Sequence, residues 1–307
     1  MYKKDDKSLP DNYRPISLTC ISCKIMEHVL CSHLSNHLKI NNILTPHQHG
    51  FRKGFSTETQ LISVLDDWLS LLDKRVRTDV LLIDFSKAFD SVPHKRLLLK
   101  LNYYGITGNS LSWIKNVLLD HTQCVQVSGT PCSWISVTSG VPQGTVLGPL
   151  LFLIYINNIV HNLNSKINLF ADDAVLYSEV SNVKDVNLFQ QDLDTLSCWA
   201  ATWQMNFNLV KCRIISITRS PLKFPAGYKL CNSPLESISC HKYLGVFIQD
   251  NLEWDSHVKS VKHKAMKILG LLRRNFSGSS QYANTQAYNS LTCETSCRVC
   301  LSWLESF

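Results

Sequence analysis

The sequence Lys166-Ile-Asn-Leu-Phe-Ala-Asp-Asp-Ala-Val-Leu-Tyr177 decides the fold that we predict for this chain of 307 residues. Two adjacent carboxylates, Asp172 and Asp173, stand between two apolar runs rich in Ile, Leu, Val and aromatic residues. This pattern predicts a β-hairpin with the acidic pair at its tip. Aspartate is also favoured in turns for purely local reasons, so this stretch alone leaves a structural turn and a functional site equally open.

The acidic pair has a chemistry of its own. Adjacent aspartates in apolar surroundings repel each other and lose hydration, which is costly unless a cation compensates the charge. Hard carboxylate oxygens suit Mg²⁺ or Mn²⁺, and Mg²⁺ often takes one or two carboxylates together with substrate phosphates. If Asp172 and Asp173 are functional, the sequence therefore favours Mg²⁺ as the cofactor, with Mn²⁺ as a substitute.

A second acid lies at the end of a predicted strand. Residues 78–84, Thr-Asp-Val-Leu-Leu-Ile-Asp, have the apolar character of a buried strand that ends in Asp84. An acid at the end of a core strand is seldom needed for packing. Asp84 and Asp172 can meet only if their strands are neighbours in one sheet.

Residues 139–149, Ser-Gly-Val-Pro-Gln-Gly-Thr-Val-Leu-Gly-Pro, form a third distinctive stretch. Its glycines and prolines let the backbone approach a ligand closely. A plain loop is the alternative, but Gln143 has no evident role in a core.

The remaining pattern predicts helices and a few strands. Apolar spacing predicts helices at 21–38, 56–74, 94–104, 110–120, 150–159, 184–204 and 255–274, a strand at 213–218, a strand pair within 239–248 and a hairpin at 123–137. The helix at 255–274 is basic, which fits either a solvated face or a face that follows phosphates.

Composition limits the class of protein. Hydrophobic residues make up 45% and charged residues 18% of the chain, which excludes a disordered polymer, and the net charge of +7 favours an anionic partner. No apolar run is long enough to span a membrane and no secretory leader is evident, so we expect an intracellular protein in a reducing compartment. The twelve cysteines include the pairs Cys20/Cys23 and Cys297/Cys300 at C-x-x-C spacing, each without a partner pair. We therefore expect buried free thiols and no structural zinc.

With these motifs in order, the chain resembles the reverse transcriptase domain of non-LTR (LINE-type) retrotransposons, nearest to the jockey-like elements. The resemblance covers about residues 1–291 and rests on NYRPISLTCISCKIMEHVL (12–30), QHGFRKGFSTETQL (48–61), LLIDFSKAFDSVPH (81–94), SGVPQGTVLGPLLFLIYINNI (139–159), LFADDAVLY (169–177), NFNLVKC (206–212) and YLGVFIQDNLEWDSHV (243–258). Several separate blocks agree in residues and order, which makes the resemblance specific.

The resemblance implies an α+β fold of the right-hand polymerase type, with fingers, palm and a partial thumb. Its palm would be a ferredoxin-like antiparallel sheet backed by helices. The implied domains are fingers at 1–80, interleaved with the palm, a palm with the catalytic carboxylates at 81–248 and the start of a thumb at 249–291.

The implied activity is that of an RNA-directed DNA polymerase, which adds dNTPs to a primer 3′-hydroxyl with two Mg²⁺ ions. Its partners would be an RNA template, a DNA primer or target, and dNTPs, with no membrane. Asp84 and Asp172 would bind both metals, Asp173 would add charge beside them, and Phe85 would offer a backbone carbonyl.

Other positions of the motifs imply roles in binding substrate. Phe89 would be the steric gate against a ribose 2′-hydroxyl, and Gln143 and Gly144 would line the dNTP and template pocket. Arg14 would meet the triphosphate, and Lys24 would either neutralise phosphates or be a solvated surface charge.

Two further roles follow from the resemblance. Lys211 would be a general acid toward the leaving pyrophosphate, and Tyr243-Leu244-Gly245 would be part of the primer grip.

The chain departs from the family pattern at 292–307, where no resemblance remains. A shift of one nucleotide with suitable codons gives a family-like segment there, so we hypothesise that this tail is out of frame; a genomic locus without such a shift would disprove it. The sequence starts close to the fingers motifs, with no endonuclease domain before them, and whether such a domain belongs upstream stays open. Two alternatives stay open, a truncated and inactive nucleic-acid-binding relic and a two-metal nuclease or phosphatase. Oligomeric state and the choice between nucleus and cytoplasm stay open as well.

Overall fold

A computed structural model of the chain describes residues 2, 6, 9, 13, 15–119, 122–124, 126–127, 130–131, 133–220 and 227–275. The chain divides into two compact units, Met1–Ser239 and Cys240–Phe307. Arg14 and the tail at 292–307 lie outside the described residues. No helix in the described part is long and apolar enough to cross a membrane.

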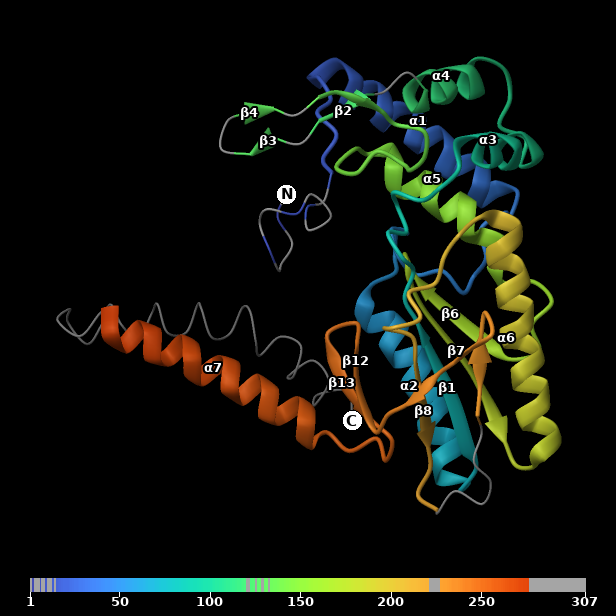
Figure 1. Ribbon diagram of the computed structural model, residues 1–307, viewed down its shortest axis with the longest axis vertical. Coiled ribbons are helices and arrows are strands. Elements are labelled where there is room, and N and C mark those ends of the chain that lie inside the picture. The colour runs from blue at the N-terminus through green and yellow to red at the C-terminus, as the bar shows by residue number, and fades with distance from the viewer. Residues whose placement is uncertain are drawn as a thin grey trace. The chain divides into compact units, whose positions relative to one another are not determined.

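The first unit is built on one twisted sheet (Figure 1). Its strands are β1 (Arg77–Ile83), β6 (Lys166–Phe170), β7 (Asp173–Val180), β8 (Arg213–Ile217) and β11 (Glu236–Ser237), in the order β11-β8-β1-β7-β6. All neighbours are antiparallel except β11 and β8. Without β11, the order fourth-first-third-second with intervening helices is that of the βαββαβ ferredoxin-like motif, as predicted.

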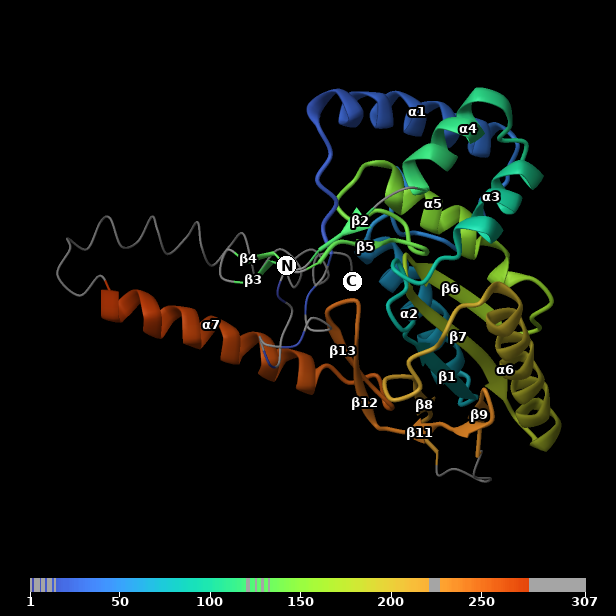
Figure 2. The same ribbon diagram turned by 45° about the horizontal axis from the view of Figure 1, so that its top comes forward.

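The sheet is covered by helices on both faces. Because side chains alternate along a strand, Leu81 and Ile83 of β1 belong to one core, together with residues of α5 (Leu147–Ile156) and α6 (Val183–Trp203). The other face of β1 carries Val80, and α2 (Thr57–Asp73) covers it: Trp68 of α2 meets the ring of Tyr177 on β7 edge-on, with 5.7 Å between centroids. Figure 2 shows the same sheet and helices from a second direction.

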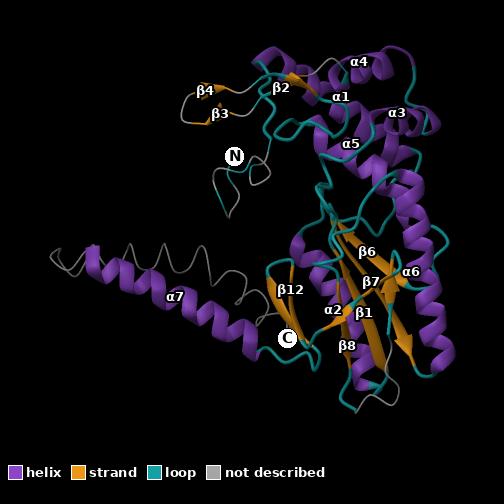
Figure 3. Ribbon diagram, viewed as in Figure 1, coloured by secondary structure: helices purple, strands orange, loops and turns teal. Residues whose placement is uncertain are grey.

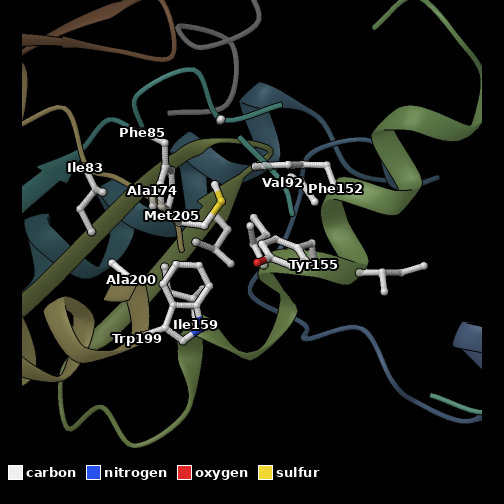
Figure 4. Packing of buried hydrophobic residues seen from close by; sticks show 14 of the residues in the cluster. Ile83, Phe85, Val92, Phe152, Tyr155, Ile159, Ala174, Trp199, Ala200 and Met205 are labelled. Atoms are coloured by element: carbon white, nitrogen blue, oxygen red, sulfur yellow. The ribbon is translucent and has the colours of Figure 1, made fainter. Parts of the chain in front are cut away.

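The remaining helices of the first unit gather around α5 (Figure 3). They are α1 (Ile21–Ile40), α3 (His94–Tyr103) and α4 (Gly108–Leu118). Nine residues of α5 are buried, as expected for a helix that is apolar on all sides. Figure 4 shows Phe152 and Tyr155 of α5 in one cluster with Trp199, Ala200 and Met205.

One buried cation joins these helices. Lys100 of α3 donates to the carbonyl oxygen of Tyr155 and, at 2.6 Å, to Oδ1 of Asn158, while its ammonium lies 3.7 Å from the ring centroid of Trp203. Burial lowers the pKa of Lys100 to about 7. Carbonyls at the end of α5 and the face of an indole replace the water that this cation has lost.

The second unit begins with a hairpin, β12 (Cys240–Tyr243) and β13 (Val246–Gln249), followed by α7 (Asp255–Asn275). Leu244 and Gly245 form its two-residue turn with φ of 44° and 92°. Positive φ at both central residues is the requirement of the tight hairpin turn that matches strand twist.

The helices and strands predicted from the sequence are confirmed, with helix bounds correct to within three residues. The hairpin predicted at 123–137 consists of two short strand pairs, β2 (Thr122–Gln123) with β5 (Ile135–Ser136) and β3 (Gln126–Val127) with β4 (Thr130–Pro131). Ala171 and Asp172 form the turn of the acidic hairpin, and Asp173 is already the first residue of β7.

The prediction that the cysteines are buried thiols is wrong for several of them. Among the cysteines described, Cys212 is buried, whereas Cys20, Cys198 and Cys231 are exposed. Cys20 is exposed because it is the N-cap of α1, where its Sγ accepts a hydrogen bond from Cys23 N at 3.4 Å. A thiol that caps a helix end has a local role that apolar context does not reveal.

Candidate active site

Two neighbouring strands bring the predicted carboxylates together. The β1–β7 register pairs Ile83 with Ala174, so its next step sets Asp84 opposite Asp173. Cross-strand partners project from the same face of a sheet, which places both side chains on one side. The backbone of Asp84 is held in turn by Asn208, whose N–H donates to its carbonyl at 2.8 Å.

The electrostatics of this end of the sheet are those of a crowded anionic site. The pKa of the Asp173 carboxyl is raised to about 6 by burial first and then by the negative charges of Asp172 and Asp84, although the side chain keeps contact with solvent. The positive charge of Lys211 acts in the opposite direction and lowers the pKa of Asp173. Its Nζ lies 3.1 Å from Oδ2 of Asp84, so a cation already pairs with one of the three acids.

This donor set suits Mg²⁺ bound in part by a substrate. Among the residues described, no three His, Cys, Asp or Glu side chains converge into a closed metal cage. A closed cage is not what Mg²⁺ needs, because it commonly uses one or two carboxylates and takes phosphate oxygens and water for the rest. Carboxylates on adjacent strands fit that chemistry, since burial first and then neighbouring negative charge raise the pKa of Asp173.

The backbone groups of Phe85 are not bonded to its bridge partner. Phe85 and Phe207 form an isolated antiparallel bridge whose hydrogen bonds are made by the flanking residues, Ser86 N to Asn206 O and Asn208 N to Asp84 O, both at 2.8 Å. In such a non-hydrogen-bonded pair, the polar backbone groups of Phe85 point away from Phe207.

The aromatic ring predicted as the steric gate stands on a rigid support. Phe89 is partly buried and stacks on Phe152 of α5, with 4.4 Å between centroids and 23° between planes. The ring of Phe51 is nearly perpendicular to that of Phe89, with 6.2 Å between the two centroids. These two rings support Phe89 from different sides.

Gln143 is oriented by a residue that the sequence did not reveal. Its Nε2 donates to Oδ1 of Asp90 at 2.6 Å. An ionised carboxylate only accepts hydrogen bonds, so Asp90 fixes the NH₂ end of the amide and directs its carbonyl oxygen elsewhere. The backbone of Gln143 is held as well, because its carbonyl accepts from Ser17 N at 2.8 Å.

The glycine-rich stretch lies directly against the segment that carries Phe89. Val141 N donates to Phe89 O at 2.7 Å, and a Cβ on Gly140 would lie 2.9 Å from Asp90 O. Gly144 adopts a φ of 85°, which a side chain would disfavour. The stretch therefore packs closely against the backbone at Phe89 and Asp90, and its approach to a ligand stays a prediction.

Not every predicted residue reaches this surface. Lys24 is exposed on α1, and in the described part of the chain no side-chain contact joins it to Gln143 or Asp90. Arg14 lies outside the described residues. Tyr243, Leu244 and Gly245 belong to the second unit, in the β12–β13 hairpin.

Three residues that support the site were missed from the sequence: Glu27, Gln48 and Asp90. The carboxylate of Glu27 is fully buried and accepts from the backbone N–H groups of Val146 and Leu147, at 2.7 and 3.3 Å. It shares the inner face of α1 with Leu34 and Leu38. A charged residue at a core-facing helical position is the pattern that could have identified it.

Comparison with known proteins places these features in a family. The family model for "Reverse transcriptase (RNA-dependent DNA polymerase)" matches residues 2–271. The chain is 30% identical, over 86% of its length, to the probable RNA-directed DNA polymerase from transposon BS of Drosophila melanogaster. It is 29% identical, over 82% of its length, to the RNA-directed DNA polymerase from mobile element jockey of Drosophila funebris. It spans 30% and 28% of the length of these two relatives.

Solved structures show the same fold. Telomerase from Candida tropicalis, in complex with a TWJ fragment of telomeric RNA, superposes with a TM-score of 0.53 at 14% identity, over 93% of this chain and 47% of that one. Apo telomerase from the same organism, truncated from its C-terminal domain, superposes with a TM-score of 0.51 at 15% identity, over 74% of this chain and 44% of that one. The predicted α+β right-hand polymerase fold is thus confirmed. With its family model matched over most of its length and its carboxylates on adjacent strands, the chain belongs to the reverse transcriptase family.

Proposed function

We propose that this chain is the RNA-directed DNA polymerase domain of a non-LTR retrotransposon of the jockey type. The observation that carries the proposal is the position of Asp84 opposite Asp173 at the end of β1 and β7, beside Asp172. The relatives named above, which are RNA-directed DNA polymerases of mobile elements, support it.

In this proposal Asp84 and Asp172 hold two Mg²⁺ ions, Asp173 adds negative charge and the carbonyl of Phe85 completes the donor set. The bound ions would neutralise charge on the attacking primer oxygen and on the leaving pyrophosphate, which is what phosphoryl transfer chiefly requires. The protein itself contributes position, because the acids come from adjacent strands of one sheet.

The pocket for the incoming nucleotide is formed by Phe89, Gln143 and Gly144. Phe89 is supported by Phe152 and would exclude a 2′-hydroxyl, which selects dNTPs. The Gln143 amide, oriented by Asp90, would present its oxygen to a donor on the substrate. Arg14 and Lys24 would meet the triphosphate.

Lys211 would have two states. In one state it pairs with Asp84, and once released from that pair the ammonium would donate a proton to the leaving pyrophosphate. Tyr243, Leu244 and Gly245 would contact the primer. RNA template, DNA primer and dNTPs are the proposed partners, and work on genomic DNA would require access to the nucleus.

Primer extension on an RNA template tests the proposal. The full chain is incubated with Mg²⁺ and dNTPs beside an Asp172→Asn variant, and we expect extension that is lost in the variant. Cleavage of the strand in place of extension would indicate the nuclease alternative. Retained RNA–DNA binding with no extension would indicate a relic.

Selection of the sugar gives a second test of the same site. Phe89→Val should raise the incorporation of rNTPs relative to dNTPs by at least about 10-fold, because exclusion of the 2′-hydroxyl by the ring is what would discriminate between the two sugars. An unchanged ratio would remove Phe89 from the pocket.

A further inference from the structure

A segment from the N-terminal third of the chain lies against the acidic hairpin. His49 N donates to Leu169 O at 2.8 Å, and Leu169 N donates to His47 O at 2.9 Å. Gln48 and Leu169 thus form an isolated parallel bridge at the free edge of β6. The backbone at residues 47–49 therefore extends the sheet beside the strand that leads into the turn.

The side chain of Gln48 continues this contact to the turn itself. It is buried, with 1% exposed, and its Oε1 accepts from Ala171 N at 2.9 Å and from Gly50 N at 2.8 Å. Its Nε2 donates to Ala171 O at 3.4 Å. One amide thereby satisfies both polar backbone groups of Ala171, the residue immediately before Asp172.

Ala171 needs such support. It adopts a φ of 55°, a left-handed conformation that residues with a Cβ rarely occupy. A conformation of this kind persists only where the surroundings hold it. The contact is also close, because a Cβ on Gly50 would lie 2.2 Å from Ala171 N.

The supporting segment is itself fixed from the side away from the hairpin. Arg52 donates through Nη1 to Thr45 O at 2.6 Å and to Gln48 O at 3.1 Å, which closes residues 45–52 into a rigid loop. Asn157 anchors the start of the same loop, because its Oδ1 accepts from Thr45 N at 2.8 Å.

We propose that Gln48 is a positioning residue that sets the direction of the Asp172 carboxylate by holding the Ala171 peptide. The inference rests on the proposed function of Asp172. The peptide between Ala171 and Asp172 determines where the Asp172 side chain starts, and a catalytic group displaced by about 1 Å loses much of its effect. The Oε1 atom of Gln48 carries this role, because it makes two hydrogen bonds that are shorter than the one made by Nε2.

The test separates positioning from stability. Gln48→Met keeps the volume of the side chain and removes its hydrogen bonds. The matched control is Asn157→Leu, which removes hydrogen bonds to Thr45 N at the start of the same loop and to Ile43 O and Tyr104 Oη outside it, but does not touch the turn. Both variants of the full chain are compared with wild type by thermal melting, by Mn²⁺ binding followed with electron paramagnetic resonance, and by the Mg²⁺ dependence of primer extension.

We expect both variants to melt earlier and Gln48→Met to lose more of its metal response. Its Mn²⁺ affinity should fall about 10-fold, in the range found for residues that orient metal ligands, with a matching rise in the Mg²⁺ needed for extension. Asn157→Leu leaves the hydrogen bonds between Gln48 and Ala171 in place, so its loss of Mn²⁺ affinity should be clearly smaller than that of Gln48→Met. Equal losses in both variants, or no loss in Gln48→Met, would overturn the proposal.

A second variant guards against a failure to fold. Gln48→Glu keeps an oxygen that accepts from Ala171 N and Gly50 N in either protonation state, so it should stay within about 3-fold of wild type in Mn²⁺ affinity. A loss as large as that expected for Gln48→Met would contradict the acceptor role.

The outcome for Gln48 is distinguishable from the outcome for the activity. If wild type binds Mn²⁺ but extends no primer, the proposed polymerase activity fails while the Mn²⁺ comparison still decides the role of Gln48. If wild type binds no Mn²⁺, the positioning role is overturned as well.

Discussion

At the scale of single residues, the acids at the end of β1 and β7 bear a charge that the folded chain alone does not balance. The pKa of Asp173 is raised from 3.8 to about 6, chiefly by burial and then by Asp172 and Asp84. A carboxyl with a higher pKa in the folded state keeps its proton longer than in the unfolded state. The stability that this carboxyl contributes to the folded protein is therefore lost as the pH rises from 3.8 through about 6.

Asp173→Asn should accordingly stabilise the metal-free protein at neutral pH. In EDTA at pH 7.5 we expect its Tm to exceed that of wild type by about 1–3 °C, and the difference to shrink toward zero as the pH falls below about 4. Thermal melts over this range measure it. Asp66→Asn, at an exposed position of α2, should show no such gain. A lower Tm for Asp173→Asn at pH 7.5 would contradict the argument.

If the proposed function is right, Lys211 competes with metal for Asp84. Lys211→Met should raise Mn²⁺ affinity of the free protein by about 2–5-fold, the effect of removing one solvent-accessible ion pair, while primer extension slows. Isothermal titration of Mn²⁺ and single-turnover extension separate the two effects. Lys166→Met, which breaks the pair of Lys166 with Asp67 at 2.9 Å, is the control and should leave both unchanged. Weaker Mn²⁺ binding in Lys211→Met would refute the competition.

The sequence identified the acids but not the residues that hold them. Asp84, Asp172 and Asp173 stand out because acids beside apolar strands have no packing role. Gln48 lies in a polar loop where nothing local marks it, and its partner Ala171 is 123 positions away. Contacts of that kind follow from the tertiary fold, which local patterns do not specify.

At the scale of elements, the start of α5 shows why helix bounds were harder to predict than helices. Periodicity predicted a start at residue 150, whereas α5 begins at Leu147 inside the glycine- and proline-rich stretch. Its N-cap residue, Val146, provides no side-chain cap, although the preceding Thr145 accepts from Gly148 N through Oγ1 at 3.0 Å. Glu27 of α1 supplies one across space by accepting from Val146 N and Leu147 N, so the helix can begin earlier than its sequence suggests.

Removing the charge of Glu27 should weaken this junction. Glu27→Gln should lower the free energy of unfolding by about 1–2 kcal/mol, the usual cost of losing a charged acceptor at a helix N-terminus. Urea denaturation of both proteins measures the difference. Glu58→Gln, in the exposed first turn of α2, should cost no more than about 0.5 kcal/mol. Equal costs at the two positions would mean that Glu27 is not a cap.

At the scale of the whole molecule, charge is distributed so as to favour a polyanion. The net charge is +7, and α7 exposes a set of basic side chains: Lys259, Lys262, Lys264, Lys267, Arg273 and Arg274. Binding that releases counterions from nucleic acid weakens linearly in the logarithm of salt concentration.

Two lysines of α7 should therefore contribute measurably to that slope. Replacing Lys262 and Lys267 by Gln should reduce the slope of log K against log salt by about 2 for an RNA–DNA duplex, if each meets one phosphate. Fluorescence anisotropy at several salt concentrations measures it. The control replaces Lys184 and Lys229, which are exposed in the first unit, and changes net charge equally. The same reduction in both would show a general charge effect in place of a binding face.

The fit of Gly50 against Ala171 has a consequence for the history of the gene. Every missense change of a glycine codon by a single nucleotide introduces a Cβ, and at Gly50 that atom would lie 2.2 Å from a backbone nitrogen. Among copies of a mobile element that accumulate mutations, this codon should tolerate silent changes only for as long as the copies still transpose. Missense changes at codon 50 would then mark the lineages in which selection for movement has ended.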